Sequence, residues 1–328
     1  MLAFTGIDVS KEKLDLGWLR DPTTGKKKNK TIKNTKKGHE QVAEWLVKNT
    51  KQKPENIVVV LEPTNVYHEG LMYFLNEKGF KIFLANPAKA KQYAKSIGVI
   101  HKTDKMDSII LAYYGQAMQI NHKYWIPESS EARALKAMMR RLEALEKDRQ
   151  RELNRQDAFE FNPASERVTQ SLQEIIEALE SEIAALESAI DQHIESHLVL
   201  KKNRELLETI AGIGPVMSRE FTYLFAAKLF ENSKQVAAYL GLIPQLNESG
   251  KFVGRTTMSK MGPARFRAKL YMAAVVASSH NPDIKSQKER LLTAGKTKMQ
   301  ALGAAMRKLA QICFGVVKHQ TEYQPQVS

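Results

Sequence analysis

A run of five apolar residues at positions 57–61, Ile-Val-Val-Val-Leu, constrains the fold of this chain more than any other feature. Four of the five are β-branched and none is polar, which is typical of a central strand buried on both faces of a layered sheet. Residues 2–9 and 14–20 read as two strands joined in a hairpin-like start, and residues 80–85 as a further strand. Antiparallel strands followed by alternating strands and helices predict a mixed α/β domain.

Four carboxylates occupy matching places in this predicted domain. Asp8 ends the first strand, Glu62 follows the central one, and Asp104 and Asp107 open an apolar helical run. Residues three apart share a helix face, and adjacent strand ends meet at one rim of a sheet. Four clustered acids without a cation would repel one another, so the pattern predicts one or two Mg²⁺ ions. The alternative is ordinary helix capping, with Thr103 or Asp104 at the cap and Asp107 complementing the helix dipole.

Charge divides the chain into three parts. Its net charge is +14, and residues 1–126 carry 21 Lys and Arg against 12 Asp and Glu. Residues 127–205 carry 12 against 17, and residues 206–328 carry 17 against 7. Two basic ends around an acidic middle favour a polyanionic partner such as nucleic acid, although a merely soluble basic protein remains the alternative. We predict domains at these three ranges.

The middle segment has the periodicity of long helices. A helix is predicted over about 129–160 and ends near Asn162-Pro163. A second helix then places apolar residues at alternating spacings of four and three, a heptad pattern that indicates a coiled coil: Leu172, Ile176, Leu179, Ile183, Leu186 and Ile190. The first helix is basic and the second acidic, which favours an antiparallel helical hairpin that assembly with another protomer could extend.

The remaining nucleic-acid candidates lie in predicted loops and turns and on the basic helix. Two predicted helices joined by Gly212-Ile213-Gly214 resemble a helix-hairpin-helix, whose loop amides can hold a phosphate, although an ordinary tight turn has the same spacing. A later polar loop contains Ser249, which alone would be an unremarkable turn residue. The basic candidates for phosphate contact are Lys26, Lys27, Lys28 and Lys30 in a predicted loop, Arg140 and Arg141 on the basic helix, and Arg255 and Lys260 near the serine.

Cysteine usage and hydropathy bear on the compartment. The single cysteine, Cys313, cannot form an intramolecular disulfide, and its apolar neighbours suggest a buried thiol. No stretch reaches the length of a membrane span, and the N-terminus lacks the pattern of a signal peptide. We therefore expect a cytoplasmic protein without a membrane partner.

Five motifs in order resemble one family along nearly the whole chain: Gly6-Ile7-Asp8-Val9-Ser10-Lys11, Leu61-Glu62-Pro63-Thr64, Lys102-Thr103-Asp104-Lys105-Met106-Asp107, Ile213-Gly214, and Gly241-Leu242-Ile243-Pro244 continuing through Glu248-Ser249-Gly250 to Met258-Ser259-Lys260-Met261-Gly262. Together they look like the bridge-RNA-guided DEDD transposases, or recombinases, of bacterial insertion sequences, relatives of the pilin-gene invertases. Two departures are visible: Pro63 follows the glutamate where a small residue is common, and Lys251-Phe252 stands where small polar residues are usual.

The resemblance implies an α/β plus α architecture. An RNase H-like (RuvC-like) N-terminal domain would precede a helical coiled-coil hairpin insert and a mainly helical C-terminal transposase domain. The four family acids would fall on Asp8, Glu62, Asp104 and Asp107, and the nucleophilic serine on Ser249. The implied partners are a structured guide RNA that pairs with target and donor DNA, and copies of the chain forming dimers that pair into tetramers. Two alternatives remain at this point: a RuvC-like junction-resolving nuclease that uses only the acids, and a non-catalytic nucleic-acid-binding scaffold.

Overall fold

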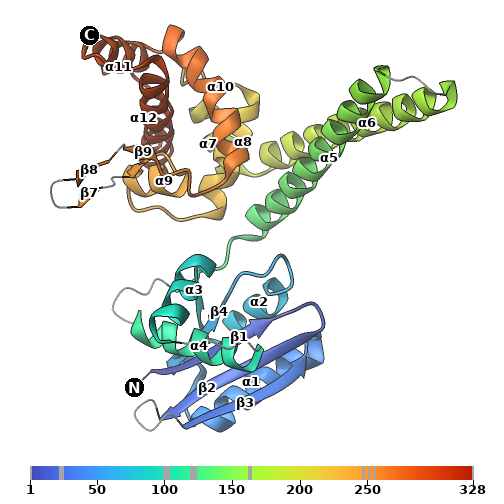
Figure 1. Ribbon diagram of the computed structural model, residues 1–328, viewed down its shortest axis with the longest axis vertical. Coiled ribbons are helices and arrows are strands. Elements are labelled where there is room, and N and C mark those ends of the chain that lie inside the picture. The colour runs from blue at the N-terminus through green and yellow to red at the C-terminus, as the bar shows by residue number, and fades with distance from the viewer. Residues whose placement is uncertain are drawn as a thin grey trace. The chain divides into compact units, whose positions relative to one another are not determined.

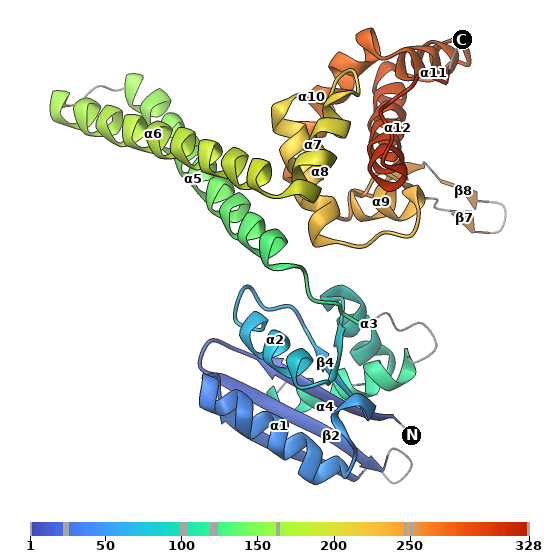
Figure 2. The same cartoon turned by 180° about the vertical axis from the view of Figure 1, so that it is seen from behind.

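The computed structural model divides into two compact units, Met1–Pro127 and Glu128–Ser328. It describes residues 2–21, 26–98, 104–118, 124–161, 165–245, 248–249, 252–254 and 256–326. Figure 1 shows the elements of both units, and Figure 2 shows them from behind. No helix among these residues is both long and apolar enough to cross a membrane.

The first unit is built on a five-stranded mixed sheet. Its strand order is β3-β2-β1-β4-β5, comprising Lys26–Lys33, Lys13–Asp21, Ala3–Val9, Ile57–Leu61 and Lys81–Leu84. β1, β2 and β3 are antiparallel, whereas β1, β4 and β5 are parallel. All five residues of β4 are buried, as the apolar run requires. The mixed α/β prediction is confirmed, and the strand order is consistent with an RNase H-like fold.

Helices cover both faces of this sheet. On one face, α1 (Lys36–Thr50) and α2 (Glu69–Glu77) pack on Ile7, Val59 and their neighbours. On the other face, α3 (Pro87–Ser96) and α4 (Asp104–Ala117) pack on Phe4 and Val60. A short 3-10 helix, Pro54–Asn56, leads into β4. Alternate residues of each strand therefore face different helical layers, and this alternation gives the face of each side chain in the five strands.

Two glycines let α4 lie directly on the sheet. A Cβ at Gly6 of β1 would collide with the Ser108 carbonyl oxygen and lie 2.7 Å from the Ala112 nitrogen. A Cβ at Gly17 of β2 would lie 2.7 Å from Ser108 Oγ. The two residues are directly paired across the strands, so together they form a shallow seat for the helix backbone.

The predicted lysine-rich loop is instead part of a strand, and that prediction was wrong. Lys26, Lys27, Lys28 and Lys30 belong to β3, which pairs with β2 from Lys26 to Lys33. β3 is an edge of the sheet, and all residues from Lys26 to Thr31 are exposed. Lysines tolerate an edge strand because their apolar stems cross the sheet margin while the ammonium groups stay in water.

The second unit begins with two long helices that pack against each other. α5 (Ser130–Glu160) and α6 (Glu166–Ser196) run antiparallel, because His193 Nε2 lies 2.9 Å from the Glu131 carbonyl oxygen at one end and Gln156 Nε2 lies 3.4 Å from Gln173 Oε1 at the other. Leu135 and Leu142 of α5 share a buried cluster with Ile183 and Ile190 of α6. The antiparallel hairpin is therefore observed, while supercoiling of the two helices stays a prediction.

The rest of the second unit is mainly helical. Its helices are α7 (Leu198–Glu208), α8 (Pro215–Ala227), α9 (Ser233–Tyr239), α10 (Ala264–His280), α11 (Pro282–Thr293) and α12 (Lys298–His319). Two short antiparallel pairs lie between α9 and α10: β6 (Pro244–Gln245) with β9 (Thr257–Met258), and β7 (Glu248–Ser249) with β8 (Phe252–Val253). One large apolar cluster joins the helices, with Phe221 and Leu309 fully buried within it.

Ion pairs tie the helical hairpin to the following helices. Arg219 of α8 donates from Nε and Nη2 to the two carboxylate oxygens of Asp191 on α6, at 2.7 and 2.6 Å. Arg204 of α7 donates to the same carboxylate at 2.8 Å. Burial alone would raise the pKa of Asp191, but the Arg219 and Arg204 guanidinium groups outweigh it and lower that pKa. The hairpin and the C-terminal helices thus form one compact unit.

Candidate active site

Asp8 and Glu62 lie at the carboxyl ends of adjacent parallel strands. β1 and β4 pair with Ile7 opposite Leu61, so the next residues along, Asp8 and Glu62, are neighbours in the same register. Ile7 and Leu61 point into the core under α1 and α2. By alternation, Asp8 and Glu62 face the opposite layer, which contains α4. Both residues are half-buried.

The start of α4 lies over this end of β1. The backbone at Ser108 contacts Gly6, whereas Gly115, two turns later, lies against Phe4 and Val60. The helix therefore runs antiparallel to β1, and its first turn, which carries Asp104 and Asp107, lies toward Asp8. In Figure 1, α4 lies in front of the sheet, and in Figure 2 it lies behind the sheet. The backbone thus brings the four predicted acids to one end of one layer.

The donor chemistry of this set fits a divalent cation. Carboxylate oxygens are the ligands that Mg²⁺ prefers, and paired acids on opposing elements can share it. The side chain of Asp104 lies outside the described residues, and Asp8 and Asp107 each have an interaction partner within the chain. Among the side chains that are described, no three His, Cys, Asp or Glu residues are grouped as a metal ion would need. The four-ligand magnesium site therefore stays a prediction.

A fifth acid beside this set was missed by the sequence analysis. Asp15 of β2 pairs directly with Asp8 of β1, so both side chains are on the α4 face. Only 4% of Asp15 is exposed. Thr31 Oγ1 of β3 donates to Asp15 Oδ1 at 2.5 Å, and Lys13 Nζ lies 3.2 Å from Asp15 Oδ2. A single acid in an amphipathic strand gives no signal by itself; the strand register identifies it.

An asparagine joins the loops that follow β1 and β4. Asn34 Nδ2 donates to the Ser10 carbonyl oxygen at 2.9 Å and to the Tyr67 carbonyl oxygen at 3.0 Å. His39 Nε2 lies 2.9 Å from Asn34 Oδ1, which can only accept, so that ring nitrogen donates. Burial lowers the pKa of His39, which favours this neutral form. Asn34 and His39 thus brace the rim beyond Asp8 and Glu62, although neither was predicted.

Ser249 lies in β7, within a small β-hairpin rather than the irregular loop that was predicted. Ser249 pairs with Phe252 of β8, and Glu248 pairs with Val253. The side chain of Ser249 and the whole of Arg255 lie outside the described residues. Lys260 is exposed and has a left-handed backbone with φ of 52°, and its N–H donates to the Gly241 carbonyl oxygen at 3.1 Å. The β6–β9 pair joins the two ends of the segment that contains Ser249.

The Gly212-Ile213-Gly214 link joins two packed helices, as predicted. Gly212 has φ of +101°, a conformation that favours glycine, and a Cβ there would lie 2.6 Å from Ala277 Cβ of α10. Asn281 Nδ2 donates to the Ala211 carbonyl oxygen at 3.3 Å. Gly214 is the N-cap residue of α8 and is exposed. The turn is rigidly held, whereas its role in binding phosphate stays a prediction.

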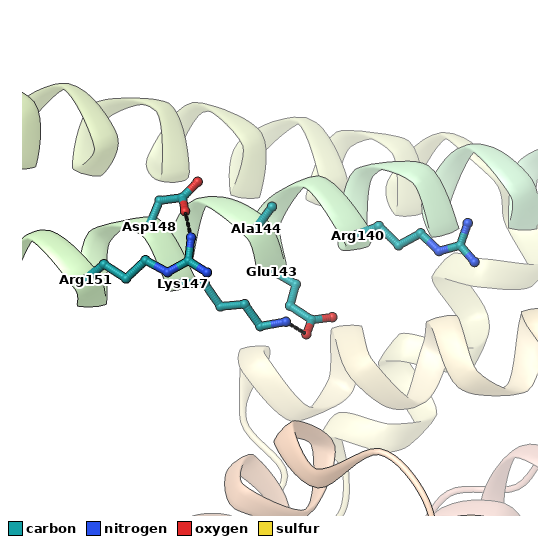
Figure 3. Close-up of a pocket in the computed structure, with 6 residues that line it drawn as sticks. All are labelled: Arg140, Glu143, Ala144, Lys147, Asp148 and Arg151. Atoms are coloured by element: carbon teal, nitrogen blue, oxygen red, sulfur yellow. Dashed lines mark hydrogen bonds and ion pairs between the residues drawn. The ribbon is translucent and has the colours of Figure 1, made fainter. Parts of the chain in front are cut away.

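The predicted basic face of α5 is largely charge-balanced. Arg140 and Arg141 are both exposed. Figure 3 shows Arg140 in a surface pocket with Lys147 and Arg151, but acids alternate with these cations. Lys147 Nζ lies 2.7 Å from Glu143 Oε1, and Arg151 Nη1 lies 2.9 Å from Asp148 Oδ1. The acid-free strand β3, with five lysines in eight residues, is the stronger candidate for phosphate contact.

Two parts of the chain match models of known protein families. Residues 5–159 match a DEDD IS110 family model described as a transposase, and residues 204–289 match a model described as the transposase IS116/IS110/IS902 family. The chain is 28% identical over 330 residues to a pilin gene-inverting protein of Moraxella bovis, covering 99% of this chain and 98% of that protein. A pilin gene-inverting protein of Moraxella lacunata is 28% identical over 327 residues, with the same coverage.

A more distant relative adds a transposase by name. A probable family 20 transposase of Pseudomonas aeruginosa is 26% identical over 158 residues, which is 47% of this chain and 46% of that protein. One family model runs from within β1 almost to the end of α5, and the other runs from the middle of α7 into α11, so the acids and Ser249 both lie in matched regions. The chain therefore contains two transposase domains of the IS110 family, whose members are enzymes that act on DNA.

Proposed function

We propose that this transposase is an RNA-guided recombinase that cuts and rejoins target and donor DNA through a serine-linked intermediate. The observation that carries the proposal is the register of β1 with β4. It puts Asp8 and Glu62 side by side on the face under α4, whose first turn carries Asp104 and Asp107. The four carboxylates would hold one or two Mg²⁺ ions, which supply charge neutralisation at a phosphodiester and lower the pKa of an attacking hydroxyl.

Ser249 is the proposed nucleophile. A bond forms between Ser249 Oγ and phosphorus as the bond from phosphorus to a deoxyribose oxygen breaks, and the serine proton ends on that oxygen. In the rejoining step a DNA hydroxyl attacks the phosphoserine, and the serine regains a proton. Arg255 and Lys260, close to Ser249 in sequence, are suited to stabilise the charge on the phosphate oxygens.

Specificity in this proposal comes from base pairing with a structured guide RNA. The protein then needs backbone contacts rather than a readable code, and β3 supplies lysines for such contacts. We further propose that the chain acts as dimers that pair into tetramers. Ser249 belongs to the second unit and the acids to the first. We propose that Ser249 of one protomer works with the acids of another, which would make cutting conditional on assembly.

Covalent capture tests the reaction. The chain, its guide RNA, Mg²⁺ and end-labelled target and donor DNA should give a denaturation-resistant protein–DNA adduct. Ser249→Ala should abolish the adduct, and Asp8→Asn, Glu62→Gln, Asp104→Asn and Asp107→Asn should each reduce it at least 100-fold, because each removes a ligand charge. DNA binding should survive in all five variants. Cut DNA without an adduct would instead favour the acid-only nuclease, for which the first unit contains all four acids.

Mixing tests the shared site. Ser249→Ala protein and Asp104→Asn protein, each inactive alone, should together recover part of the adduct, because a mixed assembly contains one intact pairing of serine with acids. The adduct should form on the Asp104→Asn chain, which retains its serine. Mixed assemblies verified by two different tags that still give no adduct would refute action between protomers.

A further inference from the structure

Asp15 is a buried carboxylate directly opposite Asp8, and such a placement must be stabilised by other groups. Residues paired across antiparallel strands bring their Cβ atoms to about 5 Å, and like charges at such positions are destabilising. Asp8 and Asp15 form such a pair, and the Asp15 side chain is only 5% exposed. An acid of this kind persists where nearby groups stabilise its charge, as a donor on each oxygen does here.

The two donors to Asp15 are unequal. Thr31, on the neighbouring strand, donates to Oδ1 at 2.5 Å and fixes the carboxylate. Lys13 lies 3.2 Å from Oδ2, yet 46% of its side chain is exposed. Lys13 is two residues before Asp15 on the same strand, so it shares the α4 face and lies nearer the turn that follows Asp8. The ammonium group is therefore anchored by a buried acid and reaches solvent beside the carboxyl end of β1.

We infer that Lys13 is a phosphate-contacting residue of the candidate active site and that Asp15 is its positioning residue. The inference rests on the proposed function, since it takes the phosphodiester of that reaction as the ligand. An ammonium held next to a carboxylate–metal site can bind a non-bridging oxygen and neutralise charge that builds up during the reaction. The ion pair with Asp15, which Thr31 holds in place, already orders part of the lysine side chain and so lowers the entropy cost of binding.

A merely structural ion pair would behave differently. Its loss would lower the melting temperature, because Asp15 would keep only the Thr31 donor, and would leave the salt dependence of DNA binding unchanged. A phosphate contact instead predicts a change in the salt dependence of DNA binding. Each contact removed lowers the slope of log K against log salt by about 0.9. Binding measured without metal therefore separates the two roles independently of catalysis.

The experiment compares Lys13→Ala, Lys13→Arg, Asp15→Asn and the Lys13→Ala/Asp15→Asn double variant in the full chain with its guide RNA. Lys48→Ala is the matched control, because Lys48 is an exposed lysine on α1, which covers the other face of the sheet. Lys13→Ala should lower the salt slope by about one and slow adduct formation about 100-fold. Lys13→Arg should restore most of the rate. Asp15→Asn should also lower the salt slope and slow adduct formation. The double variant should form the adduct no more slowly than Lys13→Ala alone.

Three outcomes would overturn the inference. Lys13→Ala that matches Lys48→Ala in both slope and rate would show that Lys13 touches no phosphate. An additive double variant would show that Asp15 does not act through Lys13. Tighter Mn²⁺ binding by Lys13→Ala with an unchanged salt slope would show that the ammonium group neutralises the acids in place of a metal ion and does not contact phosphate. Failure of the proposed function is distinct, since the parent would then cut DNA without forming an adduct, or Ser249→Ala would still form one.

Discussion

Two residues at the rim of the sheet connect the loops that follow Asp8 and Glu62. Asn34 bridges the two loops that follow Asp8 and Glu62, and His39 fixes the orientation of its amide. Because burial lowers the pKa of His39 below its ordinary value of 6.5, the folded state prefers the neutral ring. The unfolded chain therefore binds a proton first as the pH falls, and the stability that comes from the neutral ring is lost below about pH 6.5.

This linkage gives a prediction for His39→Gln. Glutamine is neutral at every pH and keeps an amide donor for Asn34 Oδ1, so the variant should lose less stability than the parent between pH 7 and pH 5. Denaturant unfolding of both proteins across this range measures the difference. Parallel stability–pH curves would mean that His39 titrates equally in the folded and unfolded states.

Residue roles differ in how far the sequence predicts them. Asp8, Glu62, Asp104 and Asp107 were predicted because each follows or opens an element with a clear apolar pattern. Asp15 and Asn34 were not, because their roles depend on which residue lies across the sheet or across two loops. Strand register and loop packing are set by tertiary contacts, and no local pattern in the sequence encodes them.

Among the elements, α4 is positioned by the absence of side chains beneath it. Gly6→Ala should destabilise the first unit by roughly 2–4 kcal/mol, because a methyl group there meets helix backbone that cannot rotate away. Gly315→Ala is the matched control: Gly315 lies in α12, and a Cβ there has no heavy atom within 4 Å, so alanine should be neutral or stabilising. Chemical denaturation measures both. Equal stability of Gly6→Ala and its parent would show that α4 lifts from the sheet freely.

The apolar seam of α6 gives a second prediction at this scale. Ile183 is buried against α5, so Ile183→Asp should destabilise the hairpin by several kcal/mol through an unpaired buried charge. Ile175 of the same helix is 45% exposed, and Ile175→Asp should leave the folded chain intact. Circular dichroism and sedimentation compare the two. Loss of tetramers in Ile175→Asp alone would instead identify the outer face of α6 as an assembly contact.

The long helices were easier to predict from the sequence than β3 and the short strand pairs. The heptad and the charge difference between the two long helices predicted the antiparallel hairpin, because both signals are local and repeated. β3 was read as a loop because its lysines hide the strand pattern, and the strand is stabilised by pairing with β2 and by burial of Ile32 in the core. The short pairs around Ser249 are likewise held by contacts across the loop rather than by propensity.

For the whole molecule, charge is the property most open to test. Replacing Lys26, Lys28 and Lys30 with glutamine should weaken guide-RNA binding and lower its salt slope by up to about 2.7, while the sheet stays folded because these side chains are exposed. Filter binding at several salt concentrations gives the slope. Substituting Lys285, Lys288 and Lys296 in the second unit removes the same charge and serves as the control. An unchanged slope after the β3 substitutions would mean that the strand is only a solvated edge.

The lysines of β3 also affect what the protein does when no nucleic acid is bound. The outer edge of a sheet can accept another strand, and exposed edges are common sites of aggregation. In the described sheet, β3 forms one edge, and its five lysines would face those of any second copy aligned against it. Like charges at that spacing oppose sheet growth between molecules. A polyanion meets no such repulsion, so the same strand discourages self-association while staying open to a nucleic acid.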